Sequence, residues 1–350
     1  MRAIVVDPGR QNSARVADVP EPAASEGAIL VDTIALGVCG TDREIVSGMY
    51  GEAPPGQSYL VLGHESLGRV REAPPDCGIK PGDHVVGIVR RPDPVPCSAC
   101  AVGEWDMCRN GQYTERGIKA RNGYGSERFR IEPEFAVKVD PALGLVGVLL
   151  EPTSIVAKAW DQVERIGRRS RGWNGTRVLI TGAGPIGLLA ALIGRQRGHE
   201  VHVFDRAQDG PKPKLVAAIE ATFHNGAIEP LSKLGVDVVL ECTGASRVVR
   251  DVLEVTSPGG IVCLLGVGAP DDVLPVDFGR LNRTYVLEND VVFGSVNANR
   301  DHYQAAAAAL ARADRPWLEG LITRRVPLEN FTEALEHRHG DIKVVVDFTR

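Results

Sequence analysis

The sequence predicts an α/β protein with two domains, a mostly-β domain and a doubly wound parallel sheet. The chain has 350 residues, more than one ordinary domain of about 150 residues uses. Short apolar, β-branched runs separated by Gly and Pro fill the residues before Glu151, whereas β and α patterns alternate from there to Val296. Such alternation is typical of a parallel sheet with helices on both faces. We expect residues 1–155 and 297–350 to form the first domain and residues 156–296 the second.

Composition and charge exclude two classes of function. The chain is 43% hydrophobic and 24% charged, as globular proteins are, and its formal net charge is -5. An acidic chain without a long basic block does not match the electrostatics of nucleic-acid binding. Its longest apolar runs are far shorter than the roughly 18 residues that span a membrane, and its first residues lack the apolar core of a signal peptide. We expect a cytoplasmic protein that binds neither nucleic acid nor membrane.

The first domain is expected to consist of short strands joined by polar loops. Apolar and β-branched runs bounded by Gly and Pro are the signal of such strands. They cover residues 3–6, 15–17, 28–36 and 67–70, with a turn into a strand at 80–87 and a return to strand at 129–139. Residues 38–42 are expected to form a glycine turn that carries a thiol and a hydroxyl, and residues 92–124 a long loop.

Residues 177–205 predict a strand, a glycine turn, a helix and a second strand that ends at an acidic residue. The second domain is organised around this stretch. The turn is Gly182-Ala183-Gly184-Pro185-Ile186-Gly187. One glycine permits the tight turn, one lets the backbone approach a pyrophosphate and one lets the helix pack closely on the strand. The helix N-terminus presents free N–H groups to the phosphates. Asp205 follows 18 residues after Gly187, where an acid can accept from both ribose hydroxyls. The stretch predicts dinucleotide binding.

The remaining elements of the second half follow from the same alternation. Further strands are predicted at 236–241, 260–265 and 291–296, helices at 153–166 and 303–312, and a last strand at 342–348. Two short sequences directly follow predicted strand ends, where a cofactor crosses an open α/β sheet. They are Thr243-Gly244 and Leu265-Gly266.

Four residues are candidates for a catalytic zinc site: Cys39, His64, Glu65 and Glu151. Thiolate, imidazole and carboxylate are the ligands that zinc takes, and a catalytic site uses three of them plus an open position. Taken singly, each residue has a simpler interpretation as a buried thiol, a core histidine or a surface acid.

Three further cysteines, at 97, 100 and 108, are clustered, which in a cytoplasmic chain indicates metal or free thiols rather than disulfides.

Together these motifs resemble the zinc-dependent medium-chain alcohol dehydrogenase family over essentially the whole chain. The sequences that carry the resemblance are Val38-Cys39-Gly40-Thr41-Asp42, Gly63-His64-Glu65, Glu151-Pro152 and the glycine motif. Less specific sequences resemble its glucose dehydrogenase branch: 113–118 around Glu115, 294–297 and 341–345. The resemblance implies a GroES-like catalytic domain joined to a Rossmann nucleotide-binding domain.

The resemblance also implies the reaction, a zinc-dependent transfer of hydride from C1 of an aldose to NAD or NADP. D-glucose is the expected substrate and a lactone the product. Zinc would act as a Lewis acid on the C1 hydroxyl, and Thr41 would start a proton relay. Glu151 would bind zinc directly or through water, and Glu65 would enter and leave its shell. Another aldose, a polyol or a simple alcohol remains an alternative substrate, and a non-catalytic nucleotide-binding protein an alternative of another class.

Family similarity nominates the substrate and cofactor residues. Glu115, Glu151 and Asn297 are expected to pair with sugar hydroxyls, with Glu115 and Asn297 on opposite sides of a cleft between the domains. Some sugar dehydrogenases of this branch carry an acid where this chain has Ile155, so the exact sugar stays open. The expected cofactor residues are Gly182, Gly184, Pro185, Ile186, Gly187, Asp205, Arg206, Thr243, Leu265, Gly266, Ser295 and Asn297.

Asp205 predicts that NAD serves at least as well as NADP, because its carboxylate would repel a 2′-phosphate. Arg206 could pair with that phosphate, so use of NADP stays open.

The cysteine cluster departs from the family, whose structural zinc lobe has four cysteines. Pro94 stands at the first position, so Cys97, Cys100 and Cys108 form an incomplete lobe. Either Asp93 or a water completes the tetrahedron, or the lobe keeps three thiols. We also expect a homo-oligomer, a dimer or a tetramer.

Overall fold

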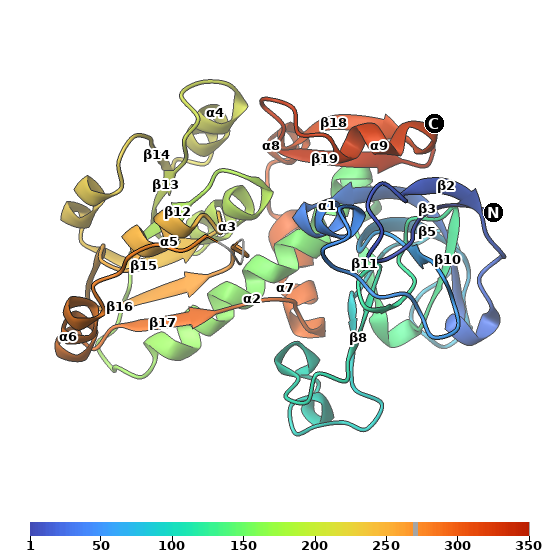
Figure 1. Ribbon diagram of the computed structural model, residues 1–350, viewed down its shortest axis with the longest axis horizontal. Helices are drawn as coiled ribbons and strands as arrows, with labels where there is room; N and C mark the ends of the chain where they lie inside the picture. Colours follow the sequence, from blue (N-terminus) through green and yellow to red (C-terminus); the bar gives the residue numbers. More distant parts are fainter. Residues whose placement is uncertain (269–271, 350) are drawn as a thin grey trace. The chain divides into compact units, whose positions relative to one another are not determined.

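The chain folds into two compact units, and the predicted α/β class is confirmed. Residues 1–268 and 272–349 are described by the computed structural model in Figure 1. The first unit consists of Met1–Ser154 and Asn297–Arg350, and the second of Ile155–Val296. The division falls within helix α2 (Leu150–Gly167). The run Pro141–Gly167 is long and apolar enough to cross a bilayer, but 72% of its apolar window is buried within the protein, as in a core helix.

The first unit is built mainly from antiparallel sheets. The largest has the strand order β11-β6-β5-β3-β19-β18 with β10 also paired to β3, and smaller sheets have the orders β2-β1-β4 and β7-β8-β9. The strands are β1 (Arg2–Val6), β2 (Arg15–Asp18), β3 (Ile29–Val38), β4 (Leu60–Val61), β5 (Glu65–Glu72), β6 (His84–Gly87), β7 (Arg90–Arg91), β8 (Thr114–Arg116), β9 (Ala120–Arg121), β10 (Arg128–Ile131), β11 (Ala136–Val139), β18 (Ile322–Pro327) and β19 (Lys343–Asp347).

Short helices connect these strands. The α-helices are α1 (Gly40–Val46), α7 (Arg300–Ala311), α8 (Arg315–Leu321) and α9 (Phe331–Leu335). The 3-10 helices are η1 (Ala24–Glu26), η2 (Cys100–Val102), η3 (Trp105–Met107), η4 (Pro133–Phe135), η5 (Pro141–Leu149) and η7 (Leu328–Asn330).

Strand β3 is the centre of the first unit, and its register positions the candidate site. Its side chains alternate between buried and half-buried along the first residues, as period-two packing requires. It pairs antiparallel with β5, which sets Gly37 opposite Glu65, and with β19, which sets Val38 opposite Val344. The end of β3, the start of β5 and the start of β19 therefore meet at one place in the sheet.

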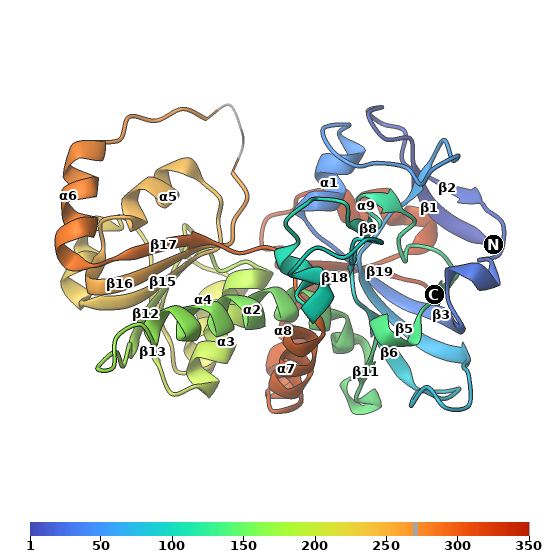
Figure 2. The same ribbon diagram turned by 90° about the horizontal axis from the view of Figure 1, so that it is seen from below.

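The second unit is a parallel sheet in the order β14-β13-β12-β15-β16-β17. Figure 2 shows α2 and α3 on one face of this sheet and α5 on the other, which is the doubly wound arrangement. The strands are β12 (Arg177–Thr181), β13 (Glu200–Phe204), β14 (Thr222–His224), β15 (Val236–Glu241), β16 (Thr256–Leu264) and β17 (Val291–Gly294). The helices are α3 (Pro185–Gln196), α4 (Pro211–Ala218), α5 (Ser246–Val252), α6 (Phe278–Glu288) and the 3-10 helix η6 (Glu229–Leu234).

Two expectations about local structure were wrong. Residues 40–46 form helix α1 rather than a glycine turn. The helix begins because the backbone N–H of Cys39 donates to Oδ2 of Asp42 at 2.9 Å, which satisfies a backbone donor at the N-terminus. Residues 92–124, expected as a loop, contain η2, η3 and the strands β8 and β9. Strand β8 pairs with β7 and β9, and these short segments carry too few residues for a periodic pattern.

Candidate active site

Three of the four predicted zinc ligands converge in the first unit. One ligand atom each of Cys39, His64 and Glu65 lies within 4.8 Å of the others. The Sγ atom of Cys39 is 3.1 Å from Nε2 of His64. His64 and Glu65 are buried, and Cys39 is half-buried. The pairing of β3 with β5 brings Cys39, which follows one strand, to the residues that begin the other.

An aspartate that sequence reasoning did not assign lies behind His64. Oδ1 of Asp42 is 3.6 Å from Nδ1 of His64, and both side chains are buried. Neither of these two atoms has a hydrogen-bond partner among the described residues. Burial opposes a charge on His64, but the Cys39 thiolate and the Asp42 carboxylate outweigh it and raise the pKa of the imidazole well above its ordinary value. A carboxylate behind an imidazole commonly orients it for metal binding.

Glu65 is held by a buried lysine that sequence reasoning also missed. The Nζ atom of Lys343 donates to Oε1 of Glu65 at 2.6 Å and to the backbone oxygen of Val38 at 3.1 Å. Only 1% of the lysine side chain and 3% of the glutamate side chain are exposed. The Glu65 carboxylate raises the pKa of Lys343 although burial opposes its charge. Entry of Glu65 into a metal shell stays a prediction, and its Oε2 has no hydrogen-bond partner among the described residues.

Glu151 and Thr41 lie in helices beside the cluster residues in the same unit. Glu151 is in the first turn of α2 and is buried. Burial raises the pKa of Glu151 to about 8; His64 opposes this increase and Glu65 adds to it. The three-residue cluster does not include its carboxylate. Thr41 is half-buried in α1, two residues after Cys39. The catalytic roles of Glu151 and Thr41 stay predictions.

The donor set fits zinc. A thiol, an imidazole and a carboxylate converge within 4.8 Å in a buried place, and an acid lies behind the imidazole. Zinc takes this combination of sulfur, nitrogen and oxygen ligands. Cys39 and His64 would hold the ion, together with Glu65 or Glu151.

The two residues expected to bind sugar hydroxyls are in direct contact. Nδ2 of Asn297 donates to Oε1 of Glu115 at 2.7 Å, and both residues are buried. Nε of Arg90 donates to the same oxygen at 3.0 Å. The expectation that Glu115 and Asn297 lie on opposite sides of a domain cleft was wrong, because both belong to the first unit. The chain re-enters that unit at Asn297, one residue after the last strand-like stretch expected from the sequence.

Asn297 and Arg90 both restrict the carboxylate of Glu115. Asn297 adopts a φ of 64°, a left-handed conformation that only a minority of residues other than glycine adopt. The guanidinium of Arg90 is buried, lies 3.7 Å from the centre of the Tyr113 ring and donates to the backbone oxygen of Asp106. Among the described residues, the hydrogen bonds that the Glu115 carboxylate accepts fall on Oε1.

The glycine turn of the second unit has the geometry of a phosphate-binding loop. Gly182 has a φ of +87°, which favours glycine. A Cβ at Gly187 would lie 1.7 Å from the backbone oxygen of Gly182, so any side chain there would collide with the turn. A Cβ at Gly184 would meet nothing within 4 Å. That open space lies at the N-terminus of α3, where phosphates bind, and the residues therefore fit a dinucleotide.

Asp205 has a cation beside it that the sequence did not reveal. Nζ of Lys212 lies 3.2 Å from Oδ2 of Asp205. The backbone N–H groups of Ala183 and Ala207 donate to the same carboxylate at 2.6 and 2.9 Å. These donors and Lys212 lower the pKa of Asp205 although burial opposes its charge. Arg206, the other expected phosphate partner, is exposed.

The other expected cofactor residues line the carboxyl ends of the strands. Oε1 of Glu241 accepts from the backbone N–H of Thr243 at 2.7 Å, and the Glu241 backbone oxygen accepts from Leu265 and Gly266. A Cβ at Gly266 would lie 2.0 Å from the nitrogen of Gly244, so two loops cross here. The Oγ atom of Ser295 is buried and has no hydrogen-bond partner among the described residues. The role of Ser295 in cofactor binding stays a prediction.

The cysteine lobe brings three thiols together without a fourth ligand. Ligand atoms of Cys97, Cys100 and Cys108 lie within 4.8 Å of one another, and Asp93 is not part of that group. The Asp93 carboxylate instead accepts from the backbone of Val95 and from Asn110. The Asn110 side chain in turn accepts from Cys108 at 3.1 Å. The structure does not bring Asp93 into the thiol group, and the three alternatives for the lobe stay predictions.

We expect the lobe to bind a second metal weakly or not at all. Three thiolates offer one ligand fewer than a structural zinc site, which lowers affinity and leaves the metal open to chelators. Metal analysis of protein purified in the presence of zinc and then dialysed against a mild chelator should find one zinc per chain. Two tightly held zinc ions per chain would contradict this expectation.

Comparisons with known proteins agree over the whole chain. A family described as alcohol dehydrogenase GroES-like domain matches residues 25–141, and one described as glucose dehydrogenase C-terminus matches residues 144–348. The glucose 1-dehydrogenase of Methanocella arvoryzae is 40% identical over 99% of both chains. Glucose 1-dehydrogenase 2 of Vulcanisaeta moutnovskia is 38% identical over 99% of both. The structure of Haloferax mediterranei glucose dehydrogenase in complex with NADP, Zn and gluconolactone is similar with a TM-score of 0.91, at 30% identity and 100% coverage of both chains.

The fold and the site together define a dehydrogenase of the zinc-dependent medium-chain class. The chain belongs to the zinc-dependent medium-chain alcohol dehydrogenase family, in its glucose dehydrogenase branch. The resemblance inferred from the sequence motifs is thereby confirmed.

Proposed function

We propose that the protein is a zinc-dependent glucose 1-dehydrogenase that oxidises D-glucose at C1 to the lactone with NAD or NADP. The observation that carries the proposal is the buried cluster of Cys39, His64 and Glu65 in the same unit as the pair of Glu115 and Asn297. The cluster would hold the zinc that binds the reacting hydroxyl, and the pair would form hydrogen bonds with the remaining hydroxyls of the sugar. We further propose a cytoplasmic homo-oligomer, a dimer or a tetramer.

The residues of the chain divide the chemistry between them. Bound zinc supplies a Lewis acid that makes the C1 hydroxyl more acidic. Oxidation removes a hydride and a proton from the sugar, and we assign the first step of proton removal to the hydroxyl of Thr41. Asp42 lies 3.6 Å behind His64, and we assign it the role of orienting the imidazole. The glycine turn, the N-terminus of α3 and Asp205 hold the dinucleotide, and Glu115, Asn297 and Glu151 recognise sugar hydroxyls.

Replacing Glu115 with Gln is expected to lower kcat/KM for glucose by roughly ten- to a hundredfold. The substitution keeps the shape and keeps one oxygen for Arg90 and Asn297, which both donate to Oε1, but it turns the other oxygen from an acceptor into a donor. One unmatched buried hydrogen bond costs about 1–3 kcal/mol. Steady-state kinetics with glucose, and a separate cofactor titration that should be unchanged, measure the effect.

The exposed acid Glu134 supplies a matched control, because Glu134→Gln makes the same chemical change away from the site. Its kinetics should equal those of the wild type. If Glu115→Gln behaves like Glu134→Gln with the true sugar, the carboxylate of Glu115 does not contact the substrate.

NAD is expected to serve at least as well as NADP, and Asp205 and Lys212 are expected to set the ratio. The Asp205 carboxylate repels a 2′-phosphate, while the ammonium beside it attracts one. Asp205→Ala should remove the repulsion, free Lys212 and move the ratio of kcat/KM values about tenfold or more towards NADP, the effect of one charged hydrogen bond of about 1.5–3 kcal/mol. Adding Lys212→Met to Asp205→Ala should reverse much of that shift.

Kinetics with both cofactors at saturating glucose check this prediction. A wild-type kcat/KM for NADP well above that for NAD would refute the role given to Asp205. An unchanged ratio after Asp205→Ala would show that the carboxylate does not face the adenosine ribose.

A further inference from the structure

Two histidines of the second unit face each other at the edge of the parallel sheet. Nδ1 of His202, on β13, lies 2.8 Å from Nε2 of His224, on the edge strand β14. The register pairs His202 with Thr222 and Phe204 with His224, so both imidazoles are on the same face of the sheet. His202 is buried and His224 is half-buried, which leaves the pair accessible from one side.

A carboxylate determines which nitrogen of His202 is free. Nε2 of His202 lies 3.1 Å from Oε1 of Glu200, whose other oxygen accepts from Arg177 at 2.9 Å. Arg177 and His202 lower the pKa of the Glu200 carboxyl, so it is ionised and only accepts. With Glu200 ionised, a neutral His202 carries its proton on Nε2 and presents the lone pair of Nδ1 to His224. Nε2 of His224 holds the proton between the two rings.

We propose that Nδ1 of His202 and Nε2 of His224 form a binding site for a divalent transition-metal ion of the kind that prefers imidazole, such as Ni²⁺ or Cu²⁺. Metal–nitrogen bonds of about 2.0–2.1 Å place two adjacent imidazole ligands about 3 Å apart. The rings already hold their nitrogens at 2.8 Å. On binding, the proton on Nε2 of His224 moves to Nδ1 of the same ring, and water completes the coordination. No proton is lost and no residue of the catalytic cluster or the cysteine lobe takes part.

The arrangement contains the outer partner that metal-binding histidines usually have. Glu200 holds the far nitrogen of His202, as a carboxylate does behind a ligating imidazole. Strand β14 is three residues long, and within the described part of the chain it pairs only with β13. An ion shared by His202 and His224 would join this short edge strand to its neighbour and stabilise the second unit.

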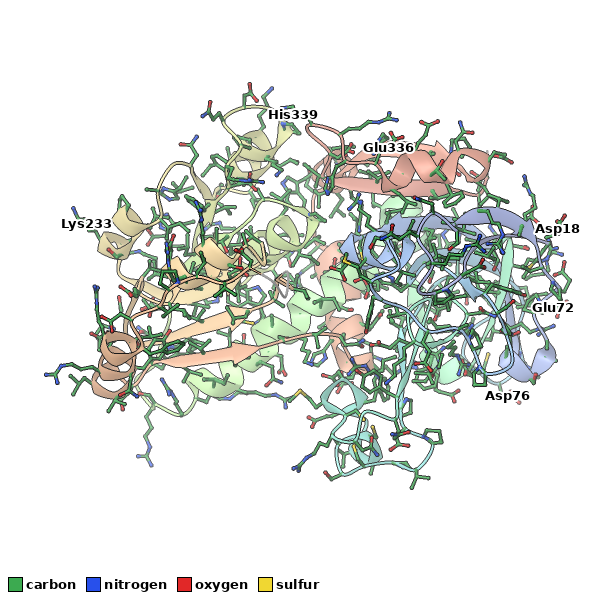
Figure 3. All side chains as sticks on the ribbon, viewed as in Figure 1. Asp18, Glu72, Asp76, Lys233, Glu336 and His339 are labelled. Atoms are coloured by element: carbon green, nitrogen blue, oxygen red, sulfur yellow. The ribbon has the colours of Figure 1, made fainter. Side chains whose placement is uncertain are left out.

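The test uses the untagged, full-length protein with its zinc sites filled, dialysed against Ni²⁺ as the probe. Wild-type protein should bind one more nickel per chain than His224→Gln and should release no zinc. Glu200→Gln should weaken nickel binding about tenfold, the usual effect of losing such an outer partner. The matched control is His339→Gln, which changes an exposed histidine, labelled in Figure 3, and should not alter the difference.

A second measurement does not depend on any variant folding. Long-range nitrogen–proton spectra of the histidine rings report which nitrogen carries the proton. Without nickel they should show His202 protonated on Nε2 and His224 on Nε2, and a diamagnetic ion such as Zn²⁺, added in excess of the filled sites, should move His224 to the Nδ1 form. The proposal would be overturned if wild type and His224→Gln bound equal amounts of nickel, or if nickel were taken up only with loss of zinc. It would also be overturned if the ring spectrum of His224 did not change when the ion was added.

Discussion

Replacing His64 with Gln should reduce kcat/KM for glucose about a thousandfold or more and should strip the protein of its catalytic zinc. His64 lies 3.1 Å from Cys39 and has Asp42 behind it, so it is the centre of the donor set. A Lewis acid on the reacting oxygen is worth several kcal/mol of transition-state stabilisation, which corresponds to about that loss of rate. Zinc content and steady-state kinetics measure both effects.

The cofactor supplies the internal control for this variant. The glycine turn and Asp205 belong to the second unit, whereas His64 belongs to the first. Titration with reduced cofactor should therefore give a nearly unchanged dissociation constant. The exposed His337 provides the matched substitution, His337→Gln, which should retain both zinc and activity. Retention of full activity by His64→Gln would contradict the zinc assignment.

Replacing Lys343 with Met should lower the free energy of unfolding by about 3–5 kcal/mol. The lysine and Glu65 form an ion pair with 1% and 3% of their side chains exposed. Removing one partner leaves the other charge buried and uncompensated, which is the costly case. Denaturant unfolding of the zinc-free protein, where the metal contributes nothing, measures the change directly.

Two further variants separate the ion pair from the loss of packing. Adding Glu65→Gln to Lys343→Met removes the stranded charge and should recover much of the lost stability. Lys138 forms a comparable pair with Asp83 at 2.9 Å, but half of its side chain is exposed, so Lys138→Met should cost less than about 1 kcal/mol. If Lys343→Met and Lys138→Met lowered the free energy of unfolding equally, the buried ion pair would contribute no more to stability than the exposed one.

Local chemistry explains what could be predicted from the sequence. The turn from Gly182 to Gly187 needs glycines at particular positions, and the structure shows the left-handed φ and the close approach that require them. Cys39 and His64 were identifiable because each stands in a short motif. Strand β15 was predicted over the residues it occupies, since its apolar run is buried on both faces.

Long-range pairing explains what could not be predicted. Lys343 is 278 positions from Glu65, and only the alignment of β19 with β3 brings them together. Asn297 was assigned to the opposite side of a cleft although residues 297–350 were expected in the first domain, because the sequence does not show its contact with Glu115, 182 positions away. Lys212 lies seven positions from Asp205 in a Pro-containing stretch whose helix has no amphipathic pattern. The roles proposed for Lys343 and Lys212 rest on the structure.

The most direct test of the account is glucose-dependent reduction of NAD by the zinc-loaded protein and by the same protein after removal of the metal. The zinc-loaded protein should reduce NAD with D-glucose faster than with other aldoses, polyols or simple alcohols, and should form the lactone. Turnover should disappear on chelation, return with added zinc and leave cofactor binding intact throughout. Full activity in a protein shown to be free of metal, or faster oxidation of ethanol than of any aldose, would contradict the account.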